Sequence, residues 1–194
     1  MINTCKFTEN STNQQIAGLI LGDYNIEFVG VKDTKEVLFI QNGHTLPFKF
    51  LPKAVLKECK EQFLKDTVAV ADLSKETTSL NRQIELYIYY LYGDVDTTPD
   101  VIDGKLTPSE NFRENATCRS LTWNTKWITI DGIALSERDL KIIDSIKNDV
   151  PDKAIAYELN IAHSTFDFHK RNLYKKLNVA SKTELLIKAL TQNV

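Results

Sequence analysis

The sequence has few cysteines, glycines and prolines, and it has no long apolar run. Its 194 residues include three Cys, seven Gly and five Pro, too few for a disulfide-rich or low-complexity chain. No stretch of about 18 or more apolar residues occurs, so the sequence predicts no membrane span. Residues 1–15 are polar and lack the zones of a secretory signal. We therefore expect a cytoplasmic protein that has no contact with a membrane.

The sequence also lacks the spacings of metal, disulfide and common catalytic sites. Cys5, Cys59 and Cys118 are odd in number and far apart, and the three histidines add no ligand spacing around them. No G-x-S-x-G, Walker A, H-E-x-x-H or G-x-G-x-x-G motif is found. We expect reduced thiols, no catalytic residues, no metal and no cofactor. A redox-active thiol is the less favoured alternative.

Positive charge is not in excess over the whole chain. The 24 Lys and Arg against 26 Asp and Glu give a net charge of −2, which by itself argues against a nucleic-acid-binding protein. Residues 1–133, however, hold 14 basic and 18 acidic side chains, a net of −4, whereas residues 134–194 hold 10 and 8, a net of +2. An acidic first part is therefore joined to a mildly basic second part.

Residues 1–118 are predicted to form an α+β regulatory and dimerisation domain. The apolar runs 26–31 and 36–40, with a polar turn between them, predict two paired strands. One helix is predicted from Pro52, at the first helical position, to Asp66, and another over residues 79–92. Strands followed by helices are typical of the α+β class.

The second of these helices ends in a segment that is apolar or aromatic on nearly every face. Residues 84–92 read Ile-Glu-Leu-Tyr-Ile-Tyr-Tyr-Leu-Tyr, so this segment is expected to be buried. We favour a core helix. The alternative is a homodimer interface, because aromatic residues are enriched at interfaces and each buried tyrosine hydroxyl needs a partner.

Turn-forming residues dominate residues 93–120, which are predicted to be a loop. Residues 119–133 are predicted to be a linker, with residues 127–130 as a strand or ordered segment before the Asp131-Gly132 turn. Trp123 and Trp127 lie in this linker, and we expect both to anchor it by apolar packing rather than to line a ligand pocket.

Residues 134–194 are predicted to form an all-α domain of four short helices. The pattern [ST]-x-x-[DE], which closes a capping box at a helix N-terminus, occurs at residues 136–139, 164–167 and 181–184, each before an apolar stripe. A further short helix is predicted over residues 152–159, ended by Asn160. A tight turn separates it from the next helix, an arrangement that presents the second helix to a DNA major groove.

The helix over residues 164–177 has an inner stripe and a basic outer face. The predicted inner stripe is Phe166, His169, Leu173 and Leu177. The predicted outer face is Ser164, Asp167, Phe168, Arg171, Asn172, Tyr174 and Lys175, with Lys170 and Lys176 at its margins. Such a charged face is most often simply solvated, but its place on the second helix of the pair favours contact with DNA.

Residues 135–190 resemble the LuxR-type DNA-binding domain of bacterial transcription regulators. The similarity includes the segments Leu-Ser-Glu-Arg-Asp, Asp-Lys-Ala-Ile-Ala-Tyr-Glu-Leu-Asn-Ile and Ser-Thr-Phe-Asp-Phe-His-Lys-Arg-Asn-Leu-Tyr-Lys-Lys-Leu-Asn-Val, without gaps, over about 29% of the chain. The resemblance implies a compact four-helix fold whose third helix, residues 164–176, enters the major groove, usually as a homodimer. The implied DNA-binding residues are Lys153, Ser164, Thr165, Asp167, Phe168, Arg171, Asn172, Lys175 and Lys176.

Within that set, the resemblance implies phosphate contacts for Lys153 and Thr165 and base contacts for Phe168 and Arg171. A phenyl ring cannot form a hydrogen bond, so a thymine methyl is the expected target of Phe168. Asp167 departs from the family, which often has a basic residue there. We favour a capping role with Ser164. The alternative is that Asp167 accepts a hydrogen bond from a cytosine or adenine amino group, and it could also pair with Arg171 one turn away.

The start of the short helix departs from the family as well. Relatives often have a Ser or Thr cap and a Glu where this chain has Pro151 and Ala154. Asp152 is then the cap that remains available.

The N-terminal part matches neither of two sensor types that the family carries. A phosphorylated receiver needs an early acidic pair, and an acyl-homoserine-lactone sensor uses a Trp in its pocket, whereas both Trp here lie in the linker. We expect a transcriptional regulator that binds double-stranded DNA as a homodimer. RNA polymerase, or a protein or small-molecule signal, is the expected further partner. The alternative is a non-catalytic adaptor whose helix-turn-helix contacts a protein.

Overall fold

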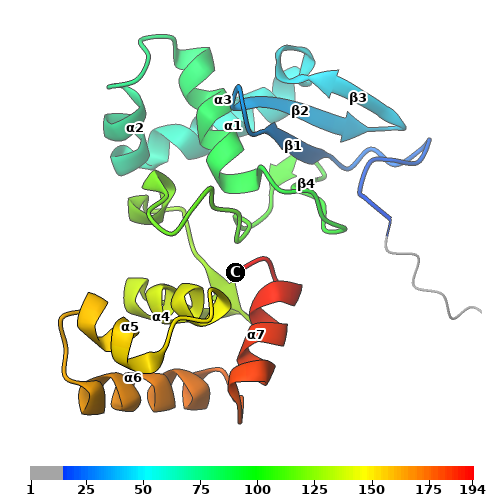
Figure 1. The fold of residues 1–194 in the computed structure, drawn as a ribbon. Coiled ribbons are helices and arrows are strands. Elements are labelled where there is room, and N and C mark those ends of the chain that lie inside the picture. Colours follow the sequence, from blue (N-terminus) through cyan, green and yellow to red (C-terminus); the bar gives the residue numbers. More distant parts are fainter. Residues whose placement is uncertain (1–14) are drawn as a thin grey trace, which may run out of the picture.

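A computed structural model describes residues 15–194 and shows two hydrophobic cores (Figure 1). One core gathers apolar side chains between Ile26 and Trp123, and the other gathers those between Ile128 and Val194, while Leu121 packs against both. Cys5 and the polar stretch of residues 1–14 lie outside the described residues. None of the helices described is long and apolar enough to cross a bilayer.

The first core is built from strands and helices. In chain order these are β1 (Glu27–Val31), β2 (Glu36–Gln41), β3 (His44–Pro47), the 3-10 turn η1 (Phe48–Phe50), α1 (Lys53–Lys65), α2 (Thr67–Leu73), α3 (Leu80–Tyr92), β4 (Val101–Ile102), β5 (Lys105–Leu106) and the 3-10 turn η2 (Arg119–Thr122). The strands β1, β2 and β3 form an antiparallel meander, and β4 pairs with β5. The α+β character predicted for this part is confirmed.

The predicted β1–β2 hairpin is confirmed, with Phe28 opposite Phe39 and Lys35 in the left-handed region of its turn. The first helix begins one residue later than predicted, because Pro52 is its N-cap. The loop prediction for residues 93–120 is wrong at β4, β5 and the start of η2. These elements are only two to four residues long, too short for a periodic pattern to reveal.

Helix α3 is buried inside its own chain, which agrees with the favoured interpretation of a core helix. Its four tyrosines are at most 4% exposed, and burial raises the pKa of Tyr87 to about 12, so that the phenol stays protonated. Each of the four hydroxyls has an intramolecular partner. The pairs are Tyr87 with Thr125 Oγ1, Tyr89 with Glu114 Oε1, Tyr90 with Lys35 Nζ and Tyr92 with the Thr107 carbonyl.

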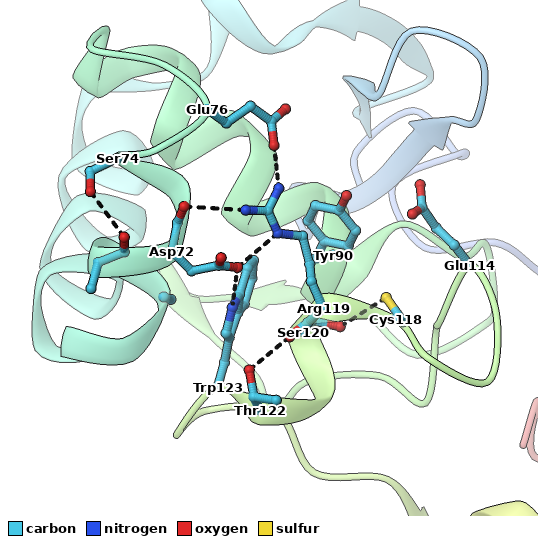
Figure 2. Close-up of polar contacts among 12 residues, drawn as sticks. Asp72, Ser74, Glu76, Tyr90, Glu114, Cys118, Arg119, Ser120, Thr122 and Trp123 are labelled. Atoms are coloured by element: carbon cyan, nitrogen blue, oxygen red, sulfur yellow. Dashed lines mark hydrogen bonds and ion pairs between the residues drawn. The ribbon is translucent and has the colours of Figure 1, made fainter.

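Arg119 and Trp123, in the segment predicted to be a linker, bind Asp72 of α2 (Figure 2). The Arg119 Nε donates to Asp72 Oδ2 at 2.7 Å, and its guanidinium also pairs with Glu76. The indole Nε1 of Trp123 donates to the same Asp72 oxygen at 3.1 Å. Trp123 is also buried in the first core and stacked on Tyr87, which confirms the predicted apolar anchor. The same prediction is wrong for Trp127, since 62% of it is exposed.

The thiols of Cys59 and Cys118 are free and buried. Burial raises the pKa of Cys59 to about 12, so this thiol is a poor nucleophile at neutral pH.

Asp66 joins α1, α2 and the linker. Its carboxylate caps α2 by accepting the Ala69 N–H at 3.0 Å, and it also accepts the backbone N–H and the hydroxyl of Thr125 at 2.9 and 2.7 Å. Burial raises the pKa of Asp66, but the hydrogen bonds from Thr125 and Ala69 outweigh that effect and leave the pKa below its usual value. Three donors therefore depend on one buried carboxylate.

Replacing this carboxylate should destabilise the first core. We expect Asp66→Ala to lower the free energy of unfolding by about 2–3 kcal/mol near neutral pH, because a cap is lost and buried donors are left unpaired. Since the folded-state pKa is lowered, the contribution is present above the ordinary pKa near 4 and is lost as the pH falls through the folded value. Urea unfolding measures the effect. Asp33→Ala, in the exposed β1–β2 turn, is the control, and an equal loss there would contradict the role of Asp66.

The second core is formed by a short hairpin and helices. In chain order these are β6 (Thr129–Ile130), β7 (Ile133–Ala134), α4 (Glu137–Lys147), α5 (Asp152–Glu158), α6 (His163–Lys176) and α7 (Lys182–Thr191). Leu140, Ile143 and Ile146 of α4 are buried as their spacing predicts, together with Ile142. In α7, Leu185 and Ala189 are buried, whereas Leu190 is 60% exposed.

Each of these four helices ends at a non-glycine residue in the left-handed region. The residues are Asp149, Asn160, Asn178 and Asn193, with φ between 50° and 56°. After α5, Ile161 N donates to the Ala156 carbonyl and Asn160 N to the Tyr157 carbonyl, which is a Schellman motif. Residues 134–194 contain no glycine. Among the other residue types, Asn and Asp adopt the left-handed conformation most readily. The predicted end at Asn160 is confirmed.

Two side chains of the segment after β5 hold the second core in place. Arg113 forms a two-pronged ion pair with Asp144 of α4, at 2.7 and 2.5 Å. The Asn111 amide nitrogen donates to the carbonyls of Thr129 and Gln192, at 2.8 and 2.7 Å. The end of α7 is thus tied to the β6 strand and to the first part of the chain.

Candidate nucleic-acid interface

Helices α5 and α6 form a helix-turn-helix pair. Buried Ile155 and Ala156 of α5 and buried Phe166 and Leu173 of α6 belong to the same core, and four residues separate the two helices. Helix α6 lies along the edge of the molecule that is farthest from α3 and the β1–β3 sheet (Figure 1). Its outer face is therefore not covered by the first part of the chain.

The start of α6 differs from the predicted capping box. Ala162 is the N-cap, and its carbonyl accepts the N–H groups of Thr165 and Phe166 at 3.0 Å. Ser164 lies inside the first turn and caps nothing, so the capping role predicted for Asp167 is wrong. The Schellman turn at Asn160 is the physical reason, because the chain is extended again by Ala162 and the helix starts before Ser164 is reached.

The other predicted caps have mixed outcomes. Ser136 and Asp139 form the complete capping box. Ser181 accepts the Glu184 N–H at 3.1 Å, but the Glu184 carboxylate accepts from Ala180 instead of from Ser181. The cap predicted at Asp152 is wrong. Pro151 occupies the N-cap of α5 without a side-chain bond, and Asp152 pairs with Lys170.

These differences predict unequal costs for two serine-to-alanine changes. Ser136→Ala should lower the free energy of unfolding by about 1 kcal/mol, because the Asp139 N–H loses its acceptor. Ser164→Ala should change it by much less, since no backbone group depends on that hydroxyl. Thermal or urea unfolding of both variants measures the difference. A comparable loss of stability in Ser164→Ala would show that Ser164 does cap α6.

Most of the predicted DNA-binding residues lie on the surface of α5 and α6. Phe168 is 55% exposed. Asp167 is half-buried. His169, which was predicted on the inner face, and Tyr174, which was predicted on the outer face, are half-buried as well. The remaining predicted residues are exposed, namely Lys153, Ser164, Thr165, Arg171, Asn172, Lys175 and Lys176.

Ion pairs divide the cations of this face into two groups. Lys170 pairs with Asp152, and Lys176 with Asp139 at 2.7 Å. Among residues 15–194, no carboxylate lies within 4.0 Å of the charged groups of Lys153, Arg171 or Lys175. These three cations are available to an anionic partner.

The expected pairing of Asp167 with Arg171 is not found. The Arg171 Nε donates to the backbone carbonyl of Asp167 at 3.2 Å, whereas the Asp167 carboxylate lies 3.9 Å from His163 Nε2. The carboxylate and the guanidinium therefore do not neutralise each other.

Two exposed side chains near this face were not singled out in the sequence. Tyr157 of α5 is 87% exposed, and His163 is the first residue of α6. Tyr157 lies outside the apolar stripe of Ile155, Ala156 and Leu159, so the sequence pattern could have predicted that it is exposed. His163 carried no such signal, because the predicted helix began one residue later.

The acidic side chains that are close enough to hold a metal lie elsewhere. Glu27, Asp96 and Glu110 form this group, and they border the first core rather than α5 or α6. The helix-turn-helix face thus offers cations, hydroxyls and exposed aromatic rings, which suit a polyanion with apolar groups in its groove.

Comparison with known proteins agrees with this geometry over the second part of the chain. Residues 134–189 match the GerE family, described as bacterial regulatory proteins of the luxR family. The HTH-type transcriptional regulator MalT of Vibrio campbellii is 36% identical over 55 residues, which are 28% of this chain and 6% of MalT. The nitrate/nitrite response regulator protein NarP of Escherichia coli is 40% identical over 58 residues, 30% of this chain and 27% of NarP.

The matched segments thus span only a small part of either relative, and no solved structure matches. The family match coincides with the elements from β7 to α7. Residues 134–189 are therefore a LuxR-family helix-turn-helix domain.

Proposed function

We propose that this protein is a transcriptional regulator that binds double-stranded DNA through α6. The observation that carries the proposal is the outer face of α6, where Phe168 is exposed and Arg171 and Lys175 have no carboxylate partner among residues 15–194. This helix follows a tight turn in a LuxR-family domain, and the second helix of such a pair fits the major groove.

The side chains of this face have different roles in the proposal. Arg171 has the geometry to donate two hydrogen bonds to guanine O6 and N7, and Phe168 would contact a thymine methyl. Lys153 and Thr165 would bind phosphates. Because Asp167 closes no cap, acceptance of a hydrogen bond from a cytosine or adenine amino group is the role left for its carboxylate. Ser164, Asn172, Lys175 and Lys176 complete the proposed contact set.

We propose a domain division at residues 1–118, 119–133 and 134–194, and binding as a homodimer. The net charge of +2 over residues 134–194 gives only modest attraction to phosphates. Two copies on a two-fold site would supply the missing affinity. In this arrangement the first domain holds the copies together and receives a protein or small-molecule signal, and RNA polymerase is the further partner.

Salt dependence separates this proposal from the adaptor alternative. In fluorescence anisotropy with duplex DNA, the logarithm of the binding constant should fall linearly with the logarithm of salt concentration, by about 0.9 for each phosphate neutralised. The full chain is titrated at several salt concentrations. Absent or salt-insensitive binding would overturn the proposal and favour an adaptor whose helix-turn-helix contacts a protein.

Replacement of Arg171 tests base recognition. Arg171→Ala should weaken specific binding by about 1–3 kcal/mol and relax the preference at one base position. Its folding stability should stay unchanged, because Arg171 is exposed. Lys141→Ala on α4 is the matched control, since it removes an exposed cation from another helix of the same domain. An equal loss on every sequence would make Arg171 a phosphate contact only.

A further inference from the structure

Five carboxylates gather where β1 meets the segment between α3 and η2. They are Glu27, Asp94, Asp96, Asp100 and Glu110. The sequence predicts no metal site, and the distance of Glu27 along the chain from the other four leaves no spacing pattern that would indicate one. The antiparallel bridge between Ile26 and Val101 brings the two regions together.

Backbone donors fix the orientation of these carboxylates. The Asp96 N–H donates to Glu27 Oε1 at 2.7 Å, and the Asp94 N–H donates to Glu110 Oε2 at 3.1 Å. The Phe28 N–H donates to Asp100 Oδ2 at 2.7 Å. One oxygen each of Glu27, Asp96 and Glu110 lies within 4.8 Å of the others. The three side chains are thus held around one point.

Two carboxylate oxygens of the cluster are buried without a partner. Glu27 is 0% exposed, and its Oε2 has no hydrogen bond. Glu110 Oε1 is likewise buried and unbonded. A native fold rarely leaves such groups without a partner. The fully buried Glu27 oxygen is the observation that points to a ligand outside the chain.

No basic side chain neutralises the cluster. Within residues 15–194, none of the five carboxylates has a Lys or Arg nitrogen within 4.0 Å. The nearby buried ammonium of Lys126 donates instead to the backbone carbonyls of Tyr90 and Glu110, at 2.9 and 2.8 Å. The cluster therefore has no direct ion pair with a basic side chain within residues 15–194.

We propose that Glu27, Asp96 and Glu110 bind a hard divalent cation, Ca²⁺ or Mg²⁺. The cluster offers only oxygen ligands, which these ions prefer, and it lacks the His and Cys ligands typical of zinc. A cation at the shared point would give Glu27 Oε2 and Glu110 Oε1 the partner that they lack. Ligands beyond these three carboxylates would be water.

An adjoining cavity provides access and room for that water. Its volume is about 400 Å³, and its walls include Asp94, Asp96, Asp100 and Glu110. Residues 191–193, at the end of α7, line it from the other side. The cation would thus stabilise the 94–110 segment beside the contact that Asn111 makes with the second core. This inference does not depend on DNA binding.

Thermal unfolding and calorimetry of the full chain test the site. After removal of metal with EDTA, Ca²⁺ or Mg²⁺ at about a hundredfold above Kd should raise Tm by about 5–10 °C. Isothermal titration should show one site. NaCl of equal ionic strength is the salt control, and Zn²⁺ is the soft-metal control.

Substitutions locate the site within the chain. Glu27→Gln should raise the Tm of the metal-free protein, because an uncompensated charge is removed, and should weaken cation binding at least tenfold. Asp96→Asn is the second variant, since it changes a half-buried loop residue and keeps the fold. The matched control Asp103→Asn, in the exposed β4–β5 turn, should bind like the parent protein.

Three results would overturn the proposal. The first is the absence of both heat and a Tm shift with Ca²⁺ and with Mg²⁺. The second is an unchanged cation affinity in Asp96→Asn. The third is binding of Zn²⁺ alone, which would exclude a hard-cation site. All three are readable without DNA, so failure here is distinct from failure of the proposed function.

Discussion

The burial of four tyrosines on α3 is the constraint on which the arrangement of the molecule depends. A buried phenol hydroxyl needs a hydrogen-bond partner, and three of the four partners here, Thr107, Glu114 and Thr125, come from the polar segment that follows the helix. That segment is therefore held against α3. It also carries Asn111 and Arg113, which bind the second core. The position of the helix-turn-helix domain is thus linked to the way in which the first core satisfies its own polar groups.

Helix termination has a comparable effect within the second core. Four helices end without glycine, each at an Asp or Asn in the left-handed region. The N–H of this residue and the N–H of the next residue close the last turn. The turn at Asn160 makes the chain extended by Ala162, and α6 begins there. As a result, neither the hydroxyl of Ser164 nor the carboxylate of Asp167 caps α6. Both remain on the face that we propose to contact DNA.

The two parts of the chain differ in the sign of the charged groups that lack an ion-pair partner. In the second part, Lys170 and Lys176 pair with acids of neighbouring helices, while Lys153, Arg171 and Lys175 have no carboxylate partner within the described residues. In the first part, the uncompensated charge is negative and partly buried, around Glu27 and Glu110. The near-zero net charge of the chain therefore conceals one surface suited to a polyanion and one site suited to a cation.

The sequence by itself determined the features that depend on local chemistry. The β1–β2 hairpin, α3 and the caps at Ser136 and Ser181 follow from residues a few positions apart, and the family similarity identified the second part. Tertiary structure decided the rest. The strand β3 has no buried residue, so its sequence lacks the alternation of apolar and polar residues that predicts a strand. Whether a lysine of α6 is free depends on acids in α4 and α5. The carboxylates of Glu27 and Glu110 meet because the bridge between Ile26 and Val101 brings the start of β1 to the segment after α3. Contacts between distant residues are set by packing and long-range hydrogen bonds, which leave no periodic trace in the chain.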